Sequence, residues 1–171
     1  DMAHWSGSFE VAEDFDLPLG IANYEANATG HFYSIHTKPD GAATSLGDIS
    51  FVTPSLSVGW RLPIAVVGAN STAIFEPQAR LAFIGGKDRT SAIPNRDASD
   101  YRIDEANLFL LNRYQGKDYI LPGTRADIGV SATTNDNFFG DVSGFFGVSR
   151  RLSGKTSAGL STDQGDKYSD Y

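Results

Sequence analysis

The residues that could do chemistry are scattered along the chain, and their spacing supports no catalytic or metal site. His4 stands far from the other two histidines, His31 and His36. Two residues five apart on a strand point to opposite faces, so His31 and His36 do not form a metal-binding pair. The chain has no cysteine, which removes thiolate ligands and nucleophiles. It also contains no G-x-S-x-G elbow, P-loop or dinucleotide fingerprint. We therefore predict that the protein is not an enzyme and has neither a metal nor a cofactor.

One acidic cluster could bind calcium, because carboxylates are the ligands that calcium prefers. It contains Asp97, Asp100, Asp104 and Glu105. The glycine and the ligand spacing of an EF-hand loop are missing from it. Acidic side chains that cap loop turns are the favoured interpretation.

The composition predicts an all-β protein that does not bind nucleic acid. The chain has 171 residues, 18 of them glycine, 11 phenylalanine and 7 tyrosine, while strong helix formers are sparse. The net charge is −7, and no basic cluster exceeds the pair Arg150–Arg151, which argues against a nucleic-acid partner. No apolar run reaches the roughly 18 residues of a transmembrane helix.

Apolar and polar residues alternate along most of the chain, which is typical of two-faced β-strands. In residues 55–65 the apolar set includes Leu56, Val58 and Trp60, and in residues 75–83 it includes Phe75, Leu81 and Phe83. The pattern predicts antiparallel, up-and-down strands at about 5–12, 22–35, 53–66, 73–84, 124–134 and 139–150. Long loops are expected at about 36–50, 85–123 and 152–167. Residues 1–171 are treated as one β-barrel segment.

Two properties of these strands favour a section of a large outer-membrane barrel. The windows are about as long as the 9–11 residues with which a tilted strand crosses a bilayer. Long and short connections also alternate, as they do where short turns face the periplasm and long loops face outside. The prolines Pro54, Pro63 and Pro77 lie in or beside strands, so we expect irregular pairing there.

A soluble β-sandwich acting as a binding module, for example for carbohydrate, is the alternative hypothesis. It would bury the apolar faces of its strands in one shared core, whereas a barrel would turn them outward to lipid. The side chains of Trp60, Leu81 and Phe146 distinguish the two hypotheses. Both ends of the chain also look internal, because the opening DMAHWSGSFE lacks a signal peptide and the closing DQGDKYSDY resembles the start of a strand.

A long composite motif lies between Ile93 and Val130. It reads Ile93-Pro94-Asn95, Asp97, Asp104-Glu105-Ala106-Asn107-Leu108-Phe109, Asn112-Arg113-Tyr114, Gly116, Asp118 and Gly123-Thr124-Arg125. This order resembles the barrel domain of the LptD family, the lipopolysaccharide-assembly proteins of Gram-negative outer membranes. The flanking stretches TPSLSVGWRLPI, FEPQARLAF and FFGVSRRLSG resemble strands of the same family. The chain departs from the family at Tyr119, where arginine is common.

The resemblance implies a non-enzymatic role in lipopolysaccharide transport and insertion into the outer leaflet of the outer membrane. The implied partners are lipopolysaccharide, outer-membrane lipid, an LptE-like plug lipoprotein inside the barrel and the periplasmic Lpt bridge components. The candidates for lumen-facing residues that contact the plug or the substrate are Glu76, Gln78, Arg80, Arg125 and Asp127.

The apolar run Leu108–Leu111 is unusual because polar residues surround it. If the loop of residues 85–123 folds into a wide lumen, this run would pack against the barrel wall or neighbouring loops. The polar residues of the family motif would then shape the loop rather than contact substrate directly. They are Pro94, Asn95, Asp97, Asp104, Asn107, Arg113, Gly116 and Asp118.

Overall fold

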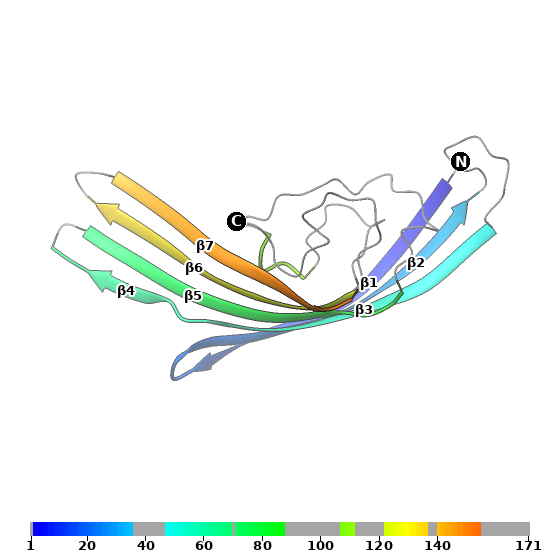
Figure 1. Ribbon diagram of the computed structural model, residues 1–171, viewed down its shortest axis with the longest axis horizontal. Helices are drawn as coiled ribbons and strands as arrows, with labels where there is room; N and C mark the ends of the chain where they lie inside the picture. The colour runs from blue at the N-terminus through cyan, green and yellow to red at the C-terminus, as the bar shows by residue number, and fades with distance from the viewer. Residues whose placement is uncertain are drawn as a thin grey trace.

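The strands form one curved antiparallel sheet. The computed structural model describes residues 2–35, 47–69, 71–87, 107–111, 122–136 and 140–154. The sheet order is β1-β2-β3-β5-β6-β7, with the short strand β4 also paired to β5 (Figure 1). The strands are β1 (Met2–Leu17), β2 (Gly20–Ile35), β3 (Gly47–Arg61), β4 (Ile64–Val67), β5 (Ser71–Ile84), β6 (Gly123–Asp136) and β7 (Gly140–Ser153).

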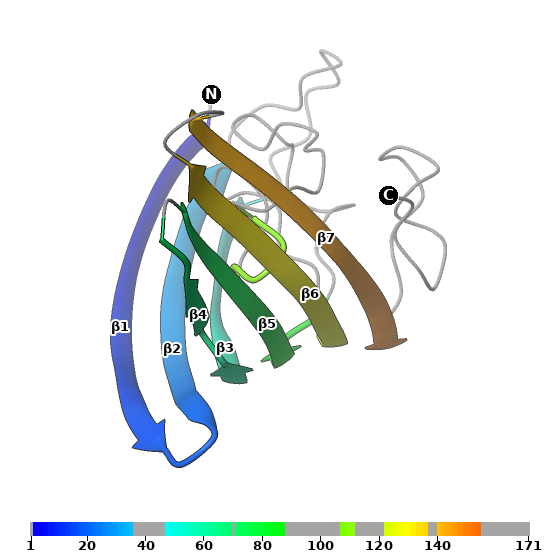
Figure 2. The ribbon, with the colours of Figure 1, turned by 90° about the vertical axis from the view of Figure 1, so that its left-hand side faces the viewer.

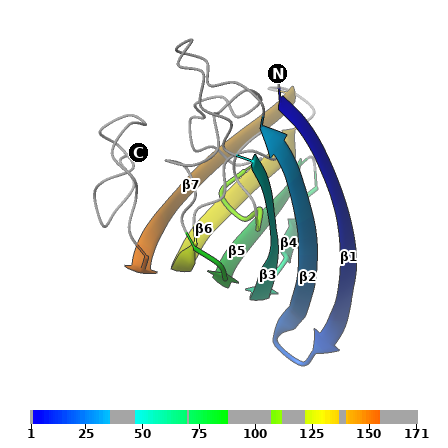
Figure 3. The same cartoon turned by 90° about the vertical axis from the view of Figure 1, so that its right-hand side faces the viewer.

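Every strand except β4 is long, between 14 and 16 residues. Soluble strands commonly have about 5–6 residues, so these are unusual for a soluble protein and sufficient to cross a bilayer at a tilt. The views from the two sides show the strands lying next to one another in a single layer (Figures 2 and 3).

Several predicted boundaries were too narrow. The strand expected at 5–12 runs from Met2 to Leu17, because its alternation continues and every residue pairs with β2. Residues 47–50, expected in a loop, begin β3 and pair with Ser34 and its neighbours on β2. Residues 152–153, also expected in a loop, end β7, and Gly123 begins β6. Loop composition at a strand end does not reveal how far the partner strand continues the pairing.

The strand expected at 53–66 is interrupted, and proline explains the interruption. β3 ends at Arg61 and β4 begins at Ile64, with Leu62 and Pro63 between them. Pro77 lies on the facing strand β5, and neither proline has an N–H to donate. The carbonyl of Pro77 instead accepts a hydrogen bond from the backbone N–H of Leu62 at 3.0 Å. Pro54 lies inside β3, and its carbonyl accepts from the N–H of Gly85 at 2.7 Å.

The connections differ in length at the two ends of the sheet. The strand ends joined by two or three residues, from β1 to β2, from β4 to β5 and from β6 to β7, lie at one end of the sheet, at the left in Figure 1. Residues 36–46 and 85–122 join strands at the other end. Within the described residues, no helix is both long enough and apolar enough to span a membrane.

The two faces of the sheet have opposite chemistry. The convex face exposes Trp5, Phe9, Leu81, Ile128 and Phe146, with Phe146 68% exposed and Ile128 59% exposed. The concave face carries the buried polar side chains His31, Thr53, Ser57, Asp127 and Ser149.

This arrangement overturns the sandwich hypothesis. The described strands make one layer, with no second sheet on the apolar face. Leu81 is 50% exposed and Phe146 more so, and the half-buried Trp60 donates its indole N–H to the carbonyl of Leu19 at 2.7 Å. These side chains therefore share no dry interior.

Candidate functional site on the concave face

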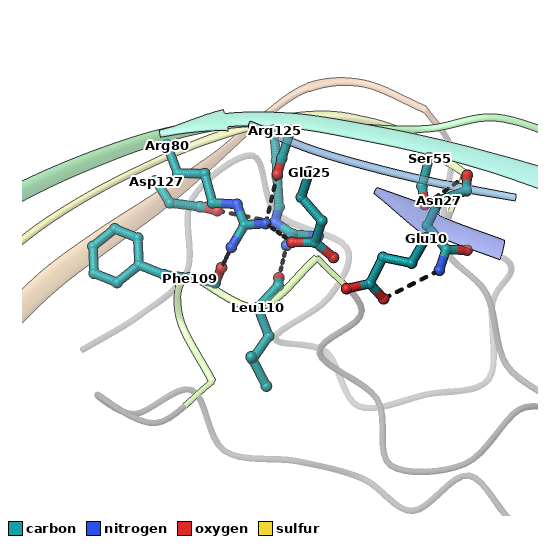
Figure 4. Close-up of polar contacts among 10 residues, drawn as sticks. Glu10, Glu25, Asn27, Ser55, Arg80, Phe109, Leu110, Arg125 and Asp127 are labelled. Carbon is teal, nitrogen blue, oxygen red and sulfur yellow. Dashed lines mark hydrogen bonds and ion pairs between the residues drawn. The ribbon is translucent and has the colours of Figure 1, made fainter. Parts of the chain in front are cut away.

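All five sequence-predicted lumen candidates lie on the concave face. Glu76, Gln78 and Arg80 alternate along β5, and Arg125 and Asp127 alternate in the same way along β6. Arg80 pairs in register with Asp127, and Ala82 pairs with Arg125. The amide of Gln78 donates to the Glu76 carboxylate at 2.9 Å. Figure 4 shows Arg80, Arg125 and Asp127 on the same side of the sheet.

Arg80 links three parts of the chain. Its guanidinium donates to the Glu25 carboxylate on β2 and to the Ser57 hydroxyl on β3, the latter at 2.5 Å. It also donates to the backbone carbonyl of Phe109 (Figure 4). A guanidinium holds several donors in a rigid fork, so one side chain can satisfy three acceptors at once.

Arg125 and Asp127 form a second ionic group next to the first. The Nε of Arg125 donates to the Asp127 carboxylate at 3.1 Å, and the Asp127 side chain is fully buried. The other carboxylate oxygen of Asp127 accepts from the Ser149 hydroxyl on β7 at 2.6 Å. Arg125 also donates to the backbone carbonyl of Leu110. A buried carboxylate is tolerated when it is paired and hydrogen-bonded in this way.

The two arginines hold a short piece of chain, Asn107–Leu111, which we call the inward segment. It lies over the concave face and contains a turn in which the Leu110 N–H donates to the Asn107 carbonyl at 3.1 Å. Because backbone carbonyls taken away from water need donors, the contacts from Arg80 and Arg125 satisfy two of them.

Small residues on the concave face of the sheet leave room for the apolar side chains of the inward segment. Leu108 is fully buried, and a Cβ added to Gly147 on β7 would come within 2.4 Å of it. Phe109 packs edge-to-face on Phe145, with ring centroids 6.4 Å apart. Leu111 clusters with Ala82 and Ile84 of β5. The apolar run predicted to pack against the wall does so, except that Leu110 is 50% exposed.

The remaining loop candidates cannot be placed in the same way. Asn107 begins the inward segment, as described above. The other residues of the family motif lie outside the described residues; they are Pro94, Asn95, Asp97, Asp104, Arg113, Gly116 and Asp118. The acidic cluster considered for calcium is outside them too, and the described part of the chain contains no group of three potential metal ligands.

Sequence reasoning missed the partners of the two arginines. Glu25, Ser57 and Ser149 alternate onto the polar faces of their strands, so their orientation could have been inferred. Their contacts with Arg80 and Asp127 depend on the register of four strand pairs. The alternation pattern does not specify this register.

A curved sheet with a polar concave face is compatible with many proteins, so the family is assigned from the sequence. The sequence profile described as LptD, LPS transport system D, matches residues 6–171. The chain belongs to the LptD family. No curated protein shows a significant match to it.

Membership of the LptD family agrees with the fold and confirms the resemblance carried by the composite motif. LptD proteins form a transport and assembly family of Gram-negative outer membranes rather than an enzyme family. At the level of the family, the function is lipopolysaccharide transport. The all-β antiparallel sheet is consistent with a section of an LptD barrel.

Proposed function

We propose that this chain forms part of the wall of an outer-membrane barrel that inserts lipopolysaccharide into the outer leaflet. The observation that carries this proposal is the division of chemistry between the two faces of the sheet. Large apolar side chains cover the exposed convex face, while ion pairs and buried hydroxyls lie on the concave face.

The apolar convex face is better suited to contact with lipid hydrocarbon than with water. Soluble monomers rarely expose a contiguous apolar patch larger than a few hundred Å². The exposed apolar side chains here extend across the sheet from Trp5 and Phe9 on β1 to Phe146 on β7. In a membrane barrel this band would contact outer-membrane lipid, and the alternation of the strands would place the polar side chains in the lumen.

On the concave face, Glu76, Gln78, Arg80, Arg125 and Asp127 would line the lumen, as proposed from the sequence. Arg80 and Arg125 already bind the inward segment, so their role would be to shape the lumen or support contact with an LptE-like plug lipoprotein. The polar residues of the family motif would shape the loop rather than contact the substrate directly.

The transport would be non-covalent, with no bond made or broken by this chain. Periplasmic Lpt bridge components would deliver lipopolysaccharide to the barrel. The short connections between strands would face the periplasm and the long ones the cell exterior.

Depletion of the protein in its Gram-negative host tests the proposal. We expect it to fractionate with the outer membrane and to migrate faster on a gel when unheated than when boiled. Depletion should lower the lipopolysaccharide that is accessible to labelling on intact cells, and re-expression should restore it. Unchanged surface lipopolysaccharide after complete depletion would contradict the proposal.

A further inference from the structure

A second feature of the concave face is a partly enclosed cavity of about 300 Å³ over β1, β2 and β3. This volume is at the lower end of the range of about 300–1,000 Å³ typical of small-molecule sites. Leu111 of the inward segment and Ile84 of β5 form one side of it. The cavity is therefore bordered both by the sheet and by the inward segment.

Hydroxyl and amide groups form the floor of the cavity in two consecutive rungs of the sheet. The first rung is Ser8, Thr29 and Thr53, which are paired across β1, β2 and β3. The second rung contains Asn27 and Ser55 at the next inward-facing positions. Neutral donors and acceptors thus repeat in two directions across the floor, which suits a ligand that carries many hydroxyl groups.

The walls of the cavity add apolar surface. Ile84 and Leu111 belong to one buried cluster. The ring of His31 is 5% exposed and is held in a stack with Phe51, at a centroid distance of 4.8 Å and an interplanar angle of 18°. A sugar ring has apolar C–H faces and polar hydroxyl edges, and the cavity offers surfaces of both kinds.

The charge of the lining distinguishes between kinds of sugar. Among the described residues, Glu10 and Glu25 are its acidic lining residues, and neither lysine nor arginine lines it. Arg80 pairs with Glu25 from the side, while Glu10 receives a hydrogen bond from the amide of Asn27 at 3.5 Å. Among the described lining residues, a phosphate group in this cavity would meet the Glu10 carboxylate and no lysine or arginine, which is unfavourable for binding.

We propose that the cavity binds an uncharged, hydroxyl-rich sugar unit of lipopolysaccharide and disfavours a phosphorylated one. The proposal rests on the proposed function, because it assumes that lipopolysaccharide sugars pass the concave face. A protein segment is the competing occupant. The rungs of short hydroxyl side chains suit a sugar better, because an extended peptide would seek the backbone groups of a free strand edge.

Site-specific photo-crosslinking in cells tests the proposal. A photo-reactive residue replaces Ser8 in the cavity or, as a control, Ser131 on the concave face of β6. The host makes lipopolysaccharide either with a long chain of uncharged outer sugars or truncated to its phosphorylated inner sugars. At position 8 we expect at least about fivefold more crosslinking to the long form, normalised to position 131.

The outcomes separate this inference from the proposed function. Lipopolysaccharide crosslinks at position 131 together with equal crosslinking of both forms at position 8 would overturn the inference alone. Crosslinks at position 8 to protein instead of lipopolysaccharide would also overturn it. Absence of lipopolysaccharide crosslinks at both positions would overturn the proposed function, and the inference with it.

Charge reversal tests the selectivity independently. The purified protein in detergent is mixed with maltotriose or its phosphate ester, and binding is followed by ligand-observed NMR. Glu10→Lys should lower the preference for the neutral sugar about fivefold, because a like charge becomes an opposite one. Glu13→Lys, on the opposite face of the same strand, is the matched control. An unchanged preference in a folded Glu10→Lys protein would overturn the proposed selectivity.

Discussion

At the scale of single residues, Arg80 and Arg125 act as a pair. They come from neighbouring strands, and each donates to a backbone carbonyl of the inward segment while it also pairs with a carboxylate of the wall. Each arginine therefore connects the loop to the sheet through charge-assisted hydrogen bonds, which are stronger than neutral ones.

Replacing Arg80 with alanine should destabilise the protein. The change leaves the Glu25 carboxylate, the Ser57 hydroxyl and the Phe109 carbonyl without this donor. The Glu25 side chain is 27% exposed, so water offsets part of the loss and we expect a cost of about 2–4 kcal/mol. The temperature at which heat-modifiable gel migration is lost should fall. Gln78→Ala, which removes only a contact along the same strand, is the control and should change it much less.

A glycine pair tests how closely the inward segment packs on β7. A Cβ at Gly147 would come within 2.4 Å of Leu108 and 2.8 Å of Phe145, whereas one at Gly144 would meet nothing within 4 Å. Gly147→Ala should therefore destabilise by about 1–3 kcal/mol, and Gly144→Ala should not. Urea unfolding in detergent measures both. Leu108→Ala should relieve part of the Gly147→Ala defect, and equal stability of the two glycine variants would contradict the described packing.

At the scale of elements, each strand separates two surroundings by alternation. Ile128 on β6 faces outward and is 59% exposed, and Ser131 on the same strand faces inward. The same element thus contributes to the apolar band and to the concave face, which is the pattern of a barrel strand.

Lysine substitutions on β6 test this separation. In lipid vesicles, Ile128→Lys should cost about 2–4 kcal/mol of folding free energy, because it would place a charge in hydrocarbon. Ser131→Lys, three residues away on the other face, should cost under about 1 kcal/mol. Urea titration of the reconstituted protein provides the comparison, and a larger cost at Ser131 would reverse the proposed orientation of the sheet.

At the scale of the whole molecule, the sheet is one layer in which β1 and β7 are the outermost strands among the described residues. Exposed strand edges and a continuous apolar face both promote aggregation in water. A surrounding bilayer and additional strands at these edges would remove both liabilities.

Membrane extraction tests this view of the molecule. The native protein should stay with the membrane pellet through washes with high salt and with alkaline carbonate, and detergent should release it. The physical reason is that exposing the apolar convex face to water costs free energy. Detergent avoids this cost because it replaces the lipid that covers the face. A peripheral membrane protein of the same host, released by carbonate, serves as the control. Release of this protein by salt alone would argue against hydrocarbon contact.

Alternation along the chain was enough to predict two-faced strands, and the composite motif was enough to predict the family. Alternation is a local property, since neighbouring side chains on a strand must point to opposite faces. The same alternation is compatible with a β-sandwich, because it does not distinguish an apolar face that packs in a core from one that contacts lipid.

The strand ends, the break at Pro63 and the partners of the two arginines became known from the three-dimensional arrangement of the strands. These features depend on register, because Glu25, Ser57 and Arg80 come together through pairing across three strands. The burial of Leu108 likewise depends on a contact distant in sequence, because the inward segment packs on Gly147 of β7. Contacts between residues far apart in the chain arise from the packing of whole elements, and no local pattern of residues encodes them.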